Sequence, residues 1–138
     1  MATPIVLKNC RIEIDGVDLS DGSNQVTVNM TKNEVDTTSF GSGGRRRAHG
    51  LSDDSFEIQF MQDYSAASVN ATLSPLQRNE TEFTVRVRPT SDPVSATNPE
   101  YEGTCILLEY TPLTGAPGEL SENSVTFPAQ GSIAENTV

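Results

Sequence analysis

The sequence predicts a mainly β protein, a β-sandwich or open barrel with one flanking α-helix. Three observations support this fold class. Apolar and polar residues alternate in several short runs, which is the period of a half-buried strand. Pairs of Asp-Gly and clusters of proline and glycine separate these runs, as turns do. A single segment places its apolar residues at helical spacing instead.

The N-terminal part is predicted to form strands joined by tight turns. Residues 10–15 (CRIEID) alternate and predict the first strand. The Asp-Gly pair at 15–16 is a strong hairpin signal, and alternation resumes at 17–19. After a second Asp-Gly pair, residues 26–30 (VTVNM) predict a strand that we expect to continue toward Phe40.

Four later segments also predict strands. Residues 56–61 (FEIQFM) show the clearest alternation, and residues 83–88 (FTVRVR) repeat it up to a proline that ends the strand. Residues 104–110 (TCILLEY) form an apolar run with β-branched and aromatic members, which favours a central strand. Residues 124–131 (SVTFPAQG) predict the last strand, followed by a flexible tail.

The helical segment lies within residues 63–79. Its apolar residues recur at helical spacing: Ala66, Val69, Leu73 and Leu76. We expect an amphipathic helix of about three turns, capped by Asp63 or Ser65. Pro75 lacks an N–H and its ring clashes with the preceding turn, so the helix should end near Leu73 or kink there.

The composition indicates one acidic domain with a lean core. The 138 residues include 9 Lys and Arg against 19 Asp and Glu, a formal net charge of −10. Such a surface repels phosphate, which argues against general nucleic-acid binding. Hydrophobic residues make up 35% of the chain and Trp is absent, so we expect a partner subunit to complete its burial.

Cys10 and Cys105 are the only cysteines, and their spacing fits neither a metal site nor a redox pair. Each lies in a strand-like run, so we expect two buried free thiols; a disulfide between them is the alternative. The sequence MATPIVLKNCRIEID lacks the basic and apolar regions of a secretory signal. No apolar run approaches the ~20 residues of a membrane helix. The protein is therefore expected to be made in the cytoplasm, without a membrane partner.

No catalytic, cofactor or metal site is predicted. The GSGGRRR segment lacks the Lys and Ser/Thr of a phosphate loop and precedes a strand, not a helix. His49 is the only histidine, with no converging ligands for zinc and no nucleophile elbow for a serine triad. Its ordinary interpretation is a loop histidine. The carboxylates are scattered, without a calcium-loop pattern or a distinguished pair.

Residues 40–52 concentrate glycine and a third of the positive charge in one loop. Glycines permit a close approach to a partner, and arginine forks suit carboxylates. We therefore expect an intersubunit loop that contacts an acidic patch of a neighbouring copy; the alternative is a solvated loop without a partner. Its residues are Phe40, Gly41, Gly43, Gly44, Arg45, Arg46, Arg47, His49 and Leu51.

Several phrases resemble the tail tube, or major tail, proteins of long-tailed bacteriophages, particularly those of actinobacteria. The most specific are QDYSAASVNATL and SATNPEYEGT, and IEIDGVDLSDGSNQVTVNM with a DTTSFG turn is similar as well. The resembling segments are 60–76, 81–90, 95–115 and 124–131, so the resemblance covers most of the chain.

The resemblance implies a structural virion protein. Copies would form hexameric rings whose inner sheets join into one β-barrel, and stacked rings would form the tube through which phage DNA leaves without specific binding. Further partners would be other tail proteins, such as the terminator and the distal tail or tape measure proteins. The 40–52 loop, the flexible N- and C-terminal arms and the 90–103 loop would lie on neighbouring subunits. The arginine run itself is not part of the resemblance.

Three alternatives stay open. A capsid decoration or cement protein would also be β-rich, but would bind a capsid surface without polymerising. A small hydrolase or sugar-binding β-sandwich would bind a metal or a ligand. A tube within a contractile tail or an injection device would keep the same architecture inside a sheath.

Overall fold

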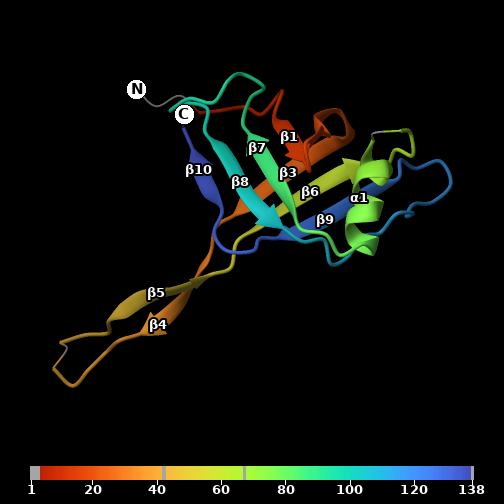
Figure 1. The fold of residues 1–138 in the computed structure, drawn as a ribbon. Helices are drawn as coiled ribbons and strands as arrows, with labels where there is room; N and C mark the ends of the chain where they lie inside the picture. The colour runs from red at the N-terminus through yellow and green to blue at the C-terminus, as the bar shows by residue number, and fades with distance from the viewer. Residues whose placement is uncertain (1–3, 42, 67, 138) are drawn as a thin grey trace.

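The computed structural model describes residues 4–41, 43–66 and 68–137, and these form ten strands, one α-helix and one short 3-10 helix. Figure 1 shows two layers of strands, a helix at one end and a long hairpin that projects from the body. The strands are β1 (Arg11–Ile14), β2 (Val17–Asp18), β3 (Ser23–Asn29), β4 (Lys32–Asp36), β5 (Arg47–Ser52), β6 (Ser55–Met61), β7 (Phe83–Arg88), β8 (Glu100–Cys105), β9 (Glu122–Pro128) and β10 (Ala134–Asn136). The helices are η1 (Ser20–Gly22) and α1 (Val69–Arg78). The predicted fold class, mainly β with one flanking α-helix, is confirmed.

The strands form three antiparallel sheets. One sheet has the order β10-β8-β7-β1-β2 and a second has the order β3-β6-β9. The third sheet is the hairpin β4-β5. The first two pack face to face over the core, and α1 buries its apolar side against the same core.

The core arises from the period of two that the sequence shows. Along β6 the buried side chains are Phe56, Ile58 and Phe60, while the residues between them face outward. Phe127 of β9 joins the two layers. Its ring packs edge to face against Phe60 of the same sheet (6.4 Å between ring centroids) and against Phe83 of β7 in the other sheet (5.7 Å). The predicted strands at 56–61, 83–88 and 124–131 therefore supply the centre of the core.

The helix differs from its prediction at both ends. It begins at Val69, after Ser68, and neither Asp63 nor Ser65 caps it with a side chain, although the Asp63 carbonyl accepts the N–H of Asn70 in the first turn (3.0 Å). The Asp63 carboxylate instead accepts the backbone N–H of Ser65 (2.8 Å) in the preceding turn. The predicted end near Leu73 is wrong, since the helix runs through Pro75 to Arg78. Burial of Leu73 and Leu76 on the core side holds the last turn despite the proline.

The strand predicted at 104–110 is wrong in its position. β8 occupies 100–105, so it begins within the expected 90–103 loop and ends after the first two residues of the predicted strand, where the chain leaves this sheet. Ile106 donates its N–H to Pro128 of β9 (3.1 Å), so the apolar run crosses from one sheet to the other. Because both layers cover this crossing, Cys105 and Leu107 are buried without being part of one long strand.

The C-terminal tail is not a free arm where the structure describes it. Residues 134–136 form β10, which pairs with β8. Ile133 just before it is buried, with its side chain near Gly103. A Cβ on Gly103 would lie 3.2 Å from Ile133 and 3.3 Å from Phe56, so this glycine lets the tail pack closely on the sheet. The N-terminal segment from residue 4 to 9, in contrast, is exposed and has no strand.

Both cysteines are free thiols, as predicted. Cys105 is buried, and this burial raises the pKa of its thiol to about 12. Cys10 is only half-buried; burial raises the pKa of its thiol too, and the thiol donates a hydrogen bond to the Arg88 carbonyl (2.9 Å).

The hairpin is anchored to the body by one buried carboxylate. Asp54 is 1% exposed and lies between β5 and β6. Its two oxygens accept the backbone N–H groups of Thr31, at the start of the hairpin (2.9 Å), and of Ile133 (2.8 Å). Its carbonyl accepts the N–H of Ala129 (2.9 Å). Asp54 thus ties the root of the hairpin to the C-terminal segment and fixes the direction in which the hairpin leaves the body.

We expect Phe127→Ala to lower the free energy of unfolding by about 3–5 kcal/mol, because it leaves a cavity between the two sheets. Phe40→Ala is the matched control: Phe40 is fully exposed, so its loss should change stability by less than about 0.5 kcal/mol. Urea unfolding of both variants at a concentration that keeps the protein monomeric measures the difference. Equal stability of the two would contradict this description of the core.

Asp54→Asn should lower the free energy of unfolding by about 1–3 kcal/mol, since an amide presents only one acceptor oxygen to the N–H groups of Thr31 and Ile133. Amide hydrogen exchange of Thr31 and Ile133 should become faster in the same variant. The exposed neighbour offers a matched control, because Asp53→Asn keeps the backbone bond of residue 53 to Thr31 and should behave as the wild type. Unchanged exchange at Thr31 in Asp54→Asn would refute the anchoring role.

Candidate self-assembly surfaces

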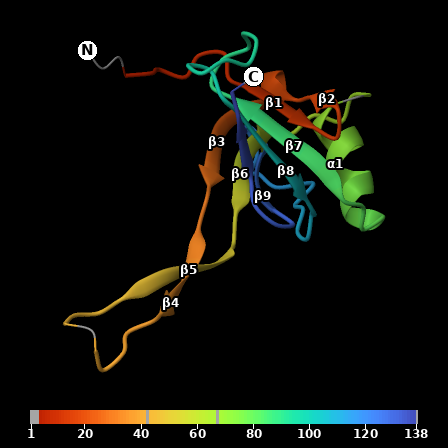
Figure 2. The same cartoon turned by 60° about the vertical axis from the view of Figure 1, so that its left-hand side comes forward.

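The projecting hairpin, residues 32–52, is called the arm below. It consists of β4, a tip from residue 37 to 46, and β5. The two strands are paired with Glu34 opposite His49, Val35 opposite Ala48 and Asp36 opposite Arg47. Both views show the arm leading away from the two packed sheets (Figures 1 and 2).

The structure brings the predicted intersubunit residues together on this arm. Part of the expected 40–52 loop is in fact strand, since β5 begins at Arg47. The tip carries Phe40, Gly41, Gly43, Gly44, Arg45 and Arg46, and β5 carries Arg47, His49 and Leu51. All nine are exposed. The contact with a neighbouring copy stays a prediction.

Two of the three arginines have partners within the arm. Arg45 Nη2 lies 3.2 Å from Asp36 Oδ2, and Arg47 Nε lies 2.5 Å from Glu34 Oε1. The pKa of the Asp36 carboxyl is lowered, chiefly by the hydrogen bond from the Thr38 N–H. Arg46 forms an ion pair with no carboxylate in the described part of the chain. Exposed pairs contribute little to stability, so they shape the arm more than they stabilise the fold.

The arm also exposes large apolar side chains. Phe40 at the tip is fully exposed, and Leu51 on β5 is 81% exposed. Val35 on β4 and Met30 just before the arm are about half exposed. Apolar groups concentrated on a thin projection that cannot bury them are typical of a binding element.

The outward face of β3-β6-β9 is polar and carries negative charge. Glu57 lies at its centre, between Thr27 and Thr126. The Glu122 carboxylate accepts hydrogen bonds from Gln59 Nε2 (2.7 Å) and Asn24 Nδ2 (2.8 Å). The three strands contain no Lys or Arg. A shallow hollow of about 250 Å³ runs over this face.

The same sheet has open edges. β3 and β9 are its outer strands. Among the described residues, β3 from Asn24 to Asn29 makes backbone hydrogen bonds to β6 alone, and β9 is joined beyond β6 only near its end, where Pro128 accepts from Ile106. Unpaired strand edges are templates for a further strand, so this sheet can be extended on both sides by other chains.

Sequence reasoning did not find this face, although its signal was present. Apart from Met61 and Pro128 at strand ends, alternate residues of all three strands are Ser, Thr, Asn, Gln or Glu, without a basic residue. What the sequence does not give is the order β3-β6-β9, which brings Glu57 and Glu122 onto one surface.

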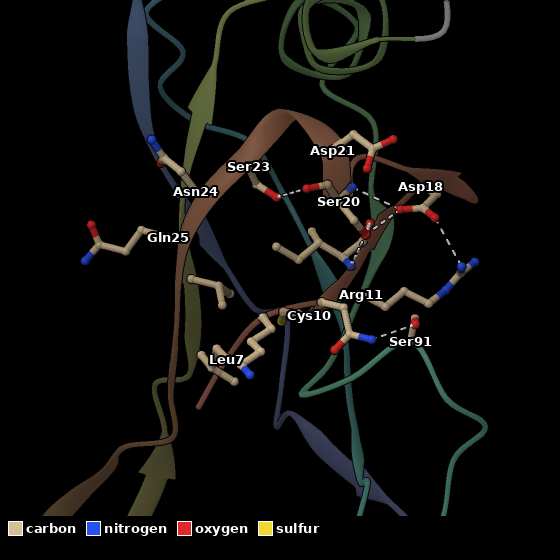
Figure 3. Close-up of a pocket in the computed structure, with 14 residues that line it drawn as sticks. Leu7, Cys10, Arg11, Asp18, Ser20, Asp21, Ser23, Asn24, Gln25 and Ser91 are labelled. Carbon is tan, nitrogen blue, oxygen red and sulfur yellow. Dashed lines mark hydrogen bonds and ion pairs between the residues drawn. The ribbon is translucent and has the colours of Figure 1, made fainter. Parts of the chain in front are cut away.

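A hollow of about 520 Å³ lies between the N-terminal segment and β3 (Figure 3). Several of its polar side chains are paired with one another: Arg11 bonds to Asp18 (3.1 Å), Asp18 accepts from the Ser20 hydroxyl (2.5 Å), and Asn9 donates to Ser91 (3.1 Å). No nucleophile with an adjacent base is formed here. The hollow is the open side of the sandwich beside the free edge of β3.

The described residues contain no group of three or more His, Cys, Asp or Glu side chains placed to hold a metal ion. Within the same residues, α1 is the one α-helix, and it is too short and too polar to cross a membrane.

No model of a protein family matches this sequence, and no curated protein is detectably similar to it. Several solved structures share its fold, among them the following three. A chain of the SPP1 tail tube matches with a TM-score of 0.75 and 14% identity, over 98% of this chain and 80% of that one. A chain from the tail of an empty gene transfer agent particle, solved with C6 symmetry, matches with a TM-score of 0.65 and 12% identity. The match covers 82% of this chain and 81% of that one.

The third structure is the sheath–tube complex of PVC, an extracellular contractile injection system, in its extended state. One of its chains matches with a TM-score of 0.69 and 11% identity, over 98% of this chain and 93% of that one. The expected similarity to phage tail tube proteins is thus confirmed at the level of the fold, and the expected relation to phages of actinobacteria stays a prediction. This chain has the fold found in phage tails, a gene transfer agent and a contractile injection system.

Proposed function

We propose that this protein is the structural subunit of a phage tail tube. Copies assemble into six-membered rings, the rings stack into a hollow tube, and DNA passes through the tube during ejection. The protein has no catalytic role, and its place is the virion. The observation that carries the proposal is the three-stranded sheet of a tail-tube-like fold, open at both edges and free of basic residues on its outward face.

Ring closure follows from the open edges. The β3 edge of one copy pairs with the β9 edge of the next, so the unpaired N–H and C=O groups of both strands gain partners. A barrel closed in this way has no edge left. The C6 symmetry of a similar tail supports six copies in the ring.

The outward face of this sheet then lines the channel. Each copy contributes Glu57 and Glu122, and six copies make two rings of carboxylates. Because DNA is a dense polyanion, such a wall offers no phosphate a binding position, and DNA slides without specific contacts. The hydroxyl and amide groups between the carboxylates keep the wall hydrated.

The arm joins one copy to another. Phe40 and Arg46 lie at its tip and Leu51 lies near its root, and all three are exposed. At the two ends of the tube the same surfaces meet other tail proteins, such as a terminator at one end and distal tail or tape measure proteins at the other.

Negative-stain electron microscopy of the purified, concentrated protein tests this function. We expect hollow rods of uniform width with six-fold end views. A decoration or cement protein would stay monomeric or form small closed oligomers under the same conditions. Absence of rods at every concentration and ionic strength, from protein with a native circular dichroism spectrum, would refute the proposal.

Replacement of the central carboxylate tests the channel wall. Tubes of Glu57→Lys should assemble and should protect short double-stranded DNA from nuclease at low salt, because each ring now holds six positive charges in the lumen. Protection should fall as salt rises. The control Glu82→Lys makes the same charge change outside this sheet and should bind DNA, if at all, where nuclease reaches it. Equal protection by both variants would place Glu57 outside the channel.

A further inference from the structure

We infer that the arm of one copy docks on the loop of residues 108–120 of a second copy, called the leucine loop below. This rests on the proposed function, since it assigns the contact that joins copies within the tube. The leucine loop connects the crossing segment after β8 to the start of β9.

The leucine loop exposes more apolar surface than a solvated loop needs. Leu113 is 77% exposed, Leu108 is 66% exposed and Leu120 is 59% exposed. Tyr64, also more than half exposed, lies beside them, because its hydroxyl donates to the Pro112 carbonyl (2.5 Å). These side chains match the exposed Phe40 and Leu51 of the arm in kind, and contact between the two sets would remove both from water.

The loop is held in shape by the body of its own chain. The Gln62 amide donates to the Pro112 carbonyl and to the Tyr110 hydroxyl. The Ser121 hydroxyl donates to the Thr114 carbonyl (2.6 Å). A loop fixed at both ends presents its leucines without a large ordering cost on binding.

The arm and the leucine loop lie at opposite ends of the same sheet. The arm leads into β6 at Ser55, whereas the leucine loop leads into β9 at Glu122, which pairs with Met61 at the other end of β6. The seven residues of β6 separate them by roughly 20 Å, and the arm points away from the sheet (Figure 1). The two surfaces therefore meet only between copies, in a head-to-tail contact that repeats without closing on itself.

The charges of the two surfaces are complementary. The chain contains no Lys or Arg after Arg88, and the leucine loop carries Glu109 and Glu119, both exposed. Arg46 at the arm tip has no carboxylate partner among the residues the structure describes. The other exposed apolar segment, residues 5–7, is followed by Lys8 and Arg11 and would repel the arm tip.

Cross-linking between differently tagged copies tests the contact. Gly41→Cys in one copy and Thr114→Cys in the other place thiols beside Phe40 and Leu113 without removing either. Both copies carry Cys10→Ser, which removes the accessible native thiol, and Cys105 is buried. In mixed tubes treated with a short bis-maleimide, we expect a covalent dimer that carries both tags. Val6→Cys, at an exposed site of the N-terminal segment, replaces Thr114→Cys in the control and should give none.

The outcomes distinguish failure of the docking contact from failure of the proposed tube function. Mixed tubes that form normally but give no Gly41–Thr114 dimer, or that give the dimer with Val6→Cys instead, overturn the docking and leave the tube intact. Failure of the wild-type protein to form tubes overturns the proposed function, and the docking with it.

A charge exchange gives an independent test. Arg46→Glu should raise the protein concentration needed for assembly by at least about tenfold, because it places like charges opposite each other. Adding Glu109→Arg and Glu119→Arg to the same chain should restore assembly. Arg78→Glu, the same charge change at the end of α1, should have no such effect. An Arg46→Glu defect that the two loop substitutions fail to rescue, in protein with a native circular dichroism spectrum, would place the acceptor elsewhere.

Discussion

The proposed assembly of copies into a tube depends on the two unlike faces of the sheet β3-β6-β9. Phe56, Ile58 and Phe60 bury one face in the core, and the residues between them leave the other face polar. A sheet of three strands with free edges is a poor final state for a single chain, because its edge groups stay unpaired. Pairing with copies of itself is the solution that keeps the polar face accessible, whereas covering the edges within the chain would need strands that this sequence uses elsewhere.

The arm and the body are coupled through few groups. Asp54 holds the start of the arm against the segment before β10, and the hydroxyls of Ser52 and Ser132 bond at 2.8 Å beside it. Beyond this root, the arm is a two-stranded ribbon whose charged groups pair locally. A ribbon of this kind is only marginally stable in water, so its rigid direction comes from the root and its final shape from what it binds.

The sequence predicts those parts in which one local pattern decides the structure. Alternation identified β1, β6, β7 and β9, where each strand has one buried face. It failed at 104–110 because the chain changes sheets there, and both layers bury its apolar residues. It predicted one strand running from residue 26 toward Phe40, whereas β3 ends at Asn29 and β4 begins at Lys32. The five residues of β4 are all exposed and carry no burial pattern that would locate it. Nothing local separates the buried Asp54 from the exposed Asp53, since only the arrival of Thr31 and Ile133 gives that carboxylate its partners.

Charge then explains why the basic residues are gathered at one place. Each copy has a formal net charge of −10, so any two copies repel, and the repulsion grows with every copy added. Apolar contacts alone would have to overcome this at each step of assembly. A cluster of arginines at the far end of an arm places positive charge where the next copy is reached first, while the sheet facing the proposed channel stays free of it. The same three arginines spread over the body would lower the repulsion equally at long range, but would also give DNA basic positions to bind. Their concentration on the arm therefore satisfies, with one short segment of sequence, two requirements of the proposed tube: attraction between copies and a channel wall that does not bind DNA.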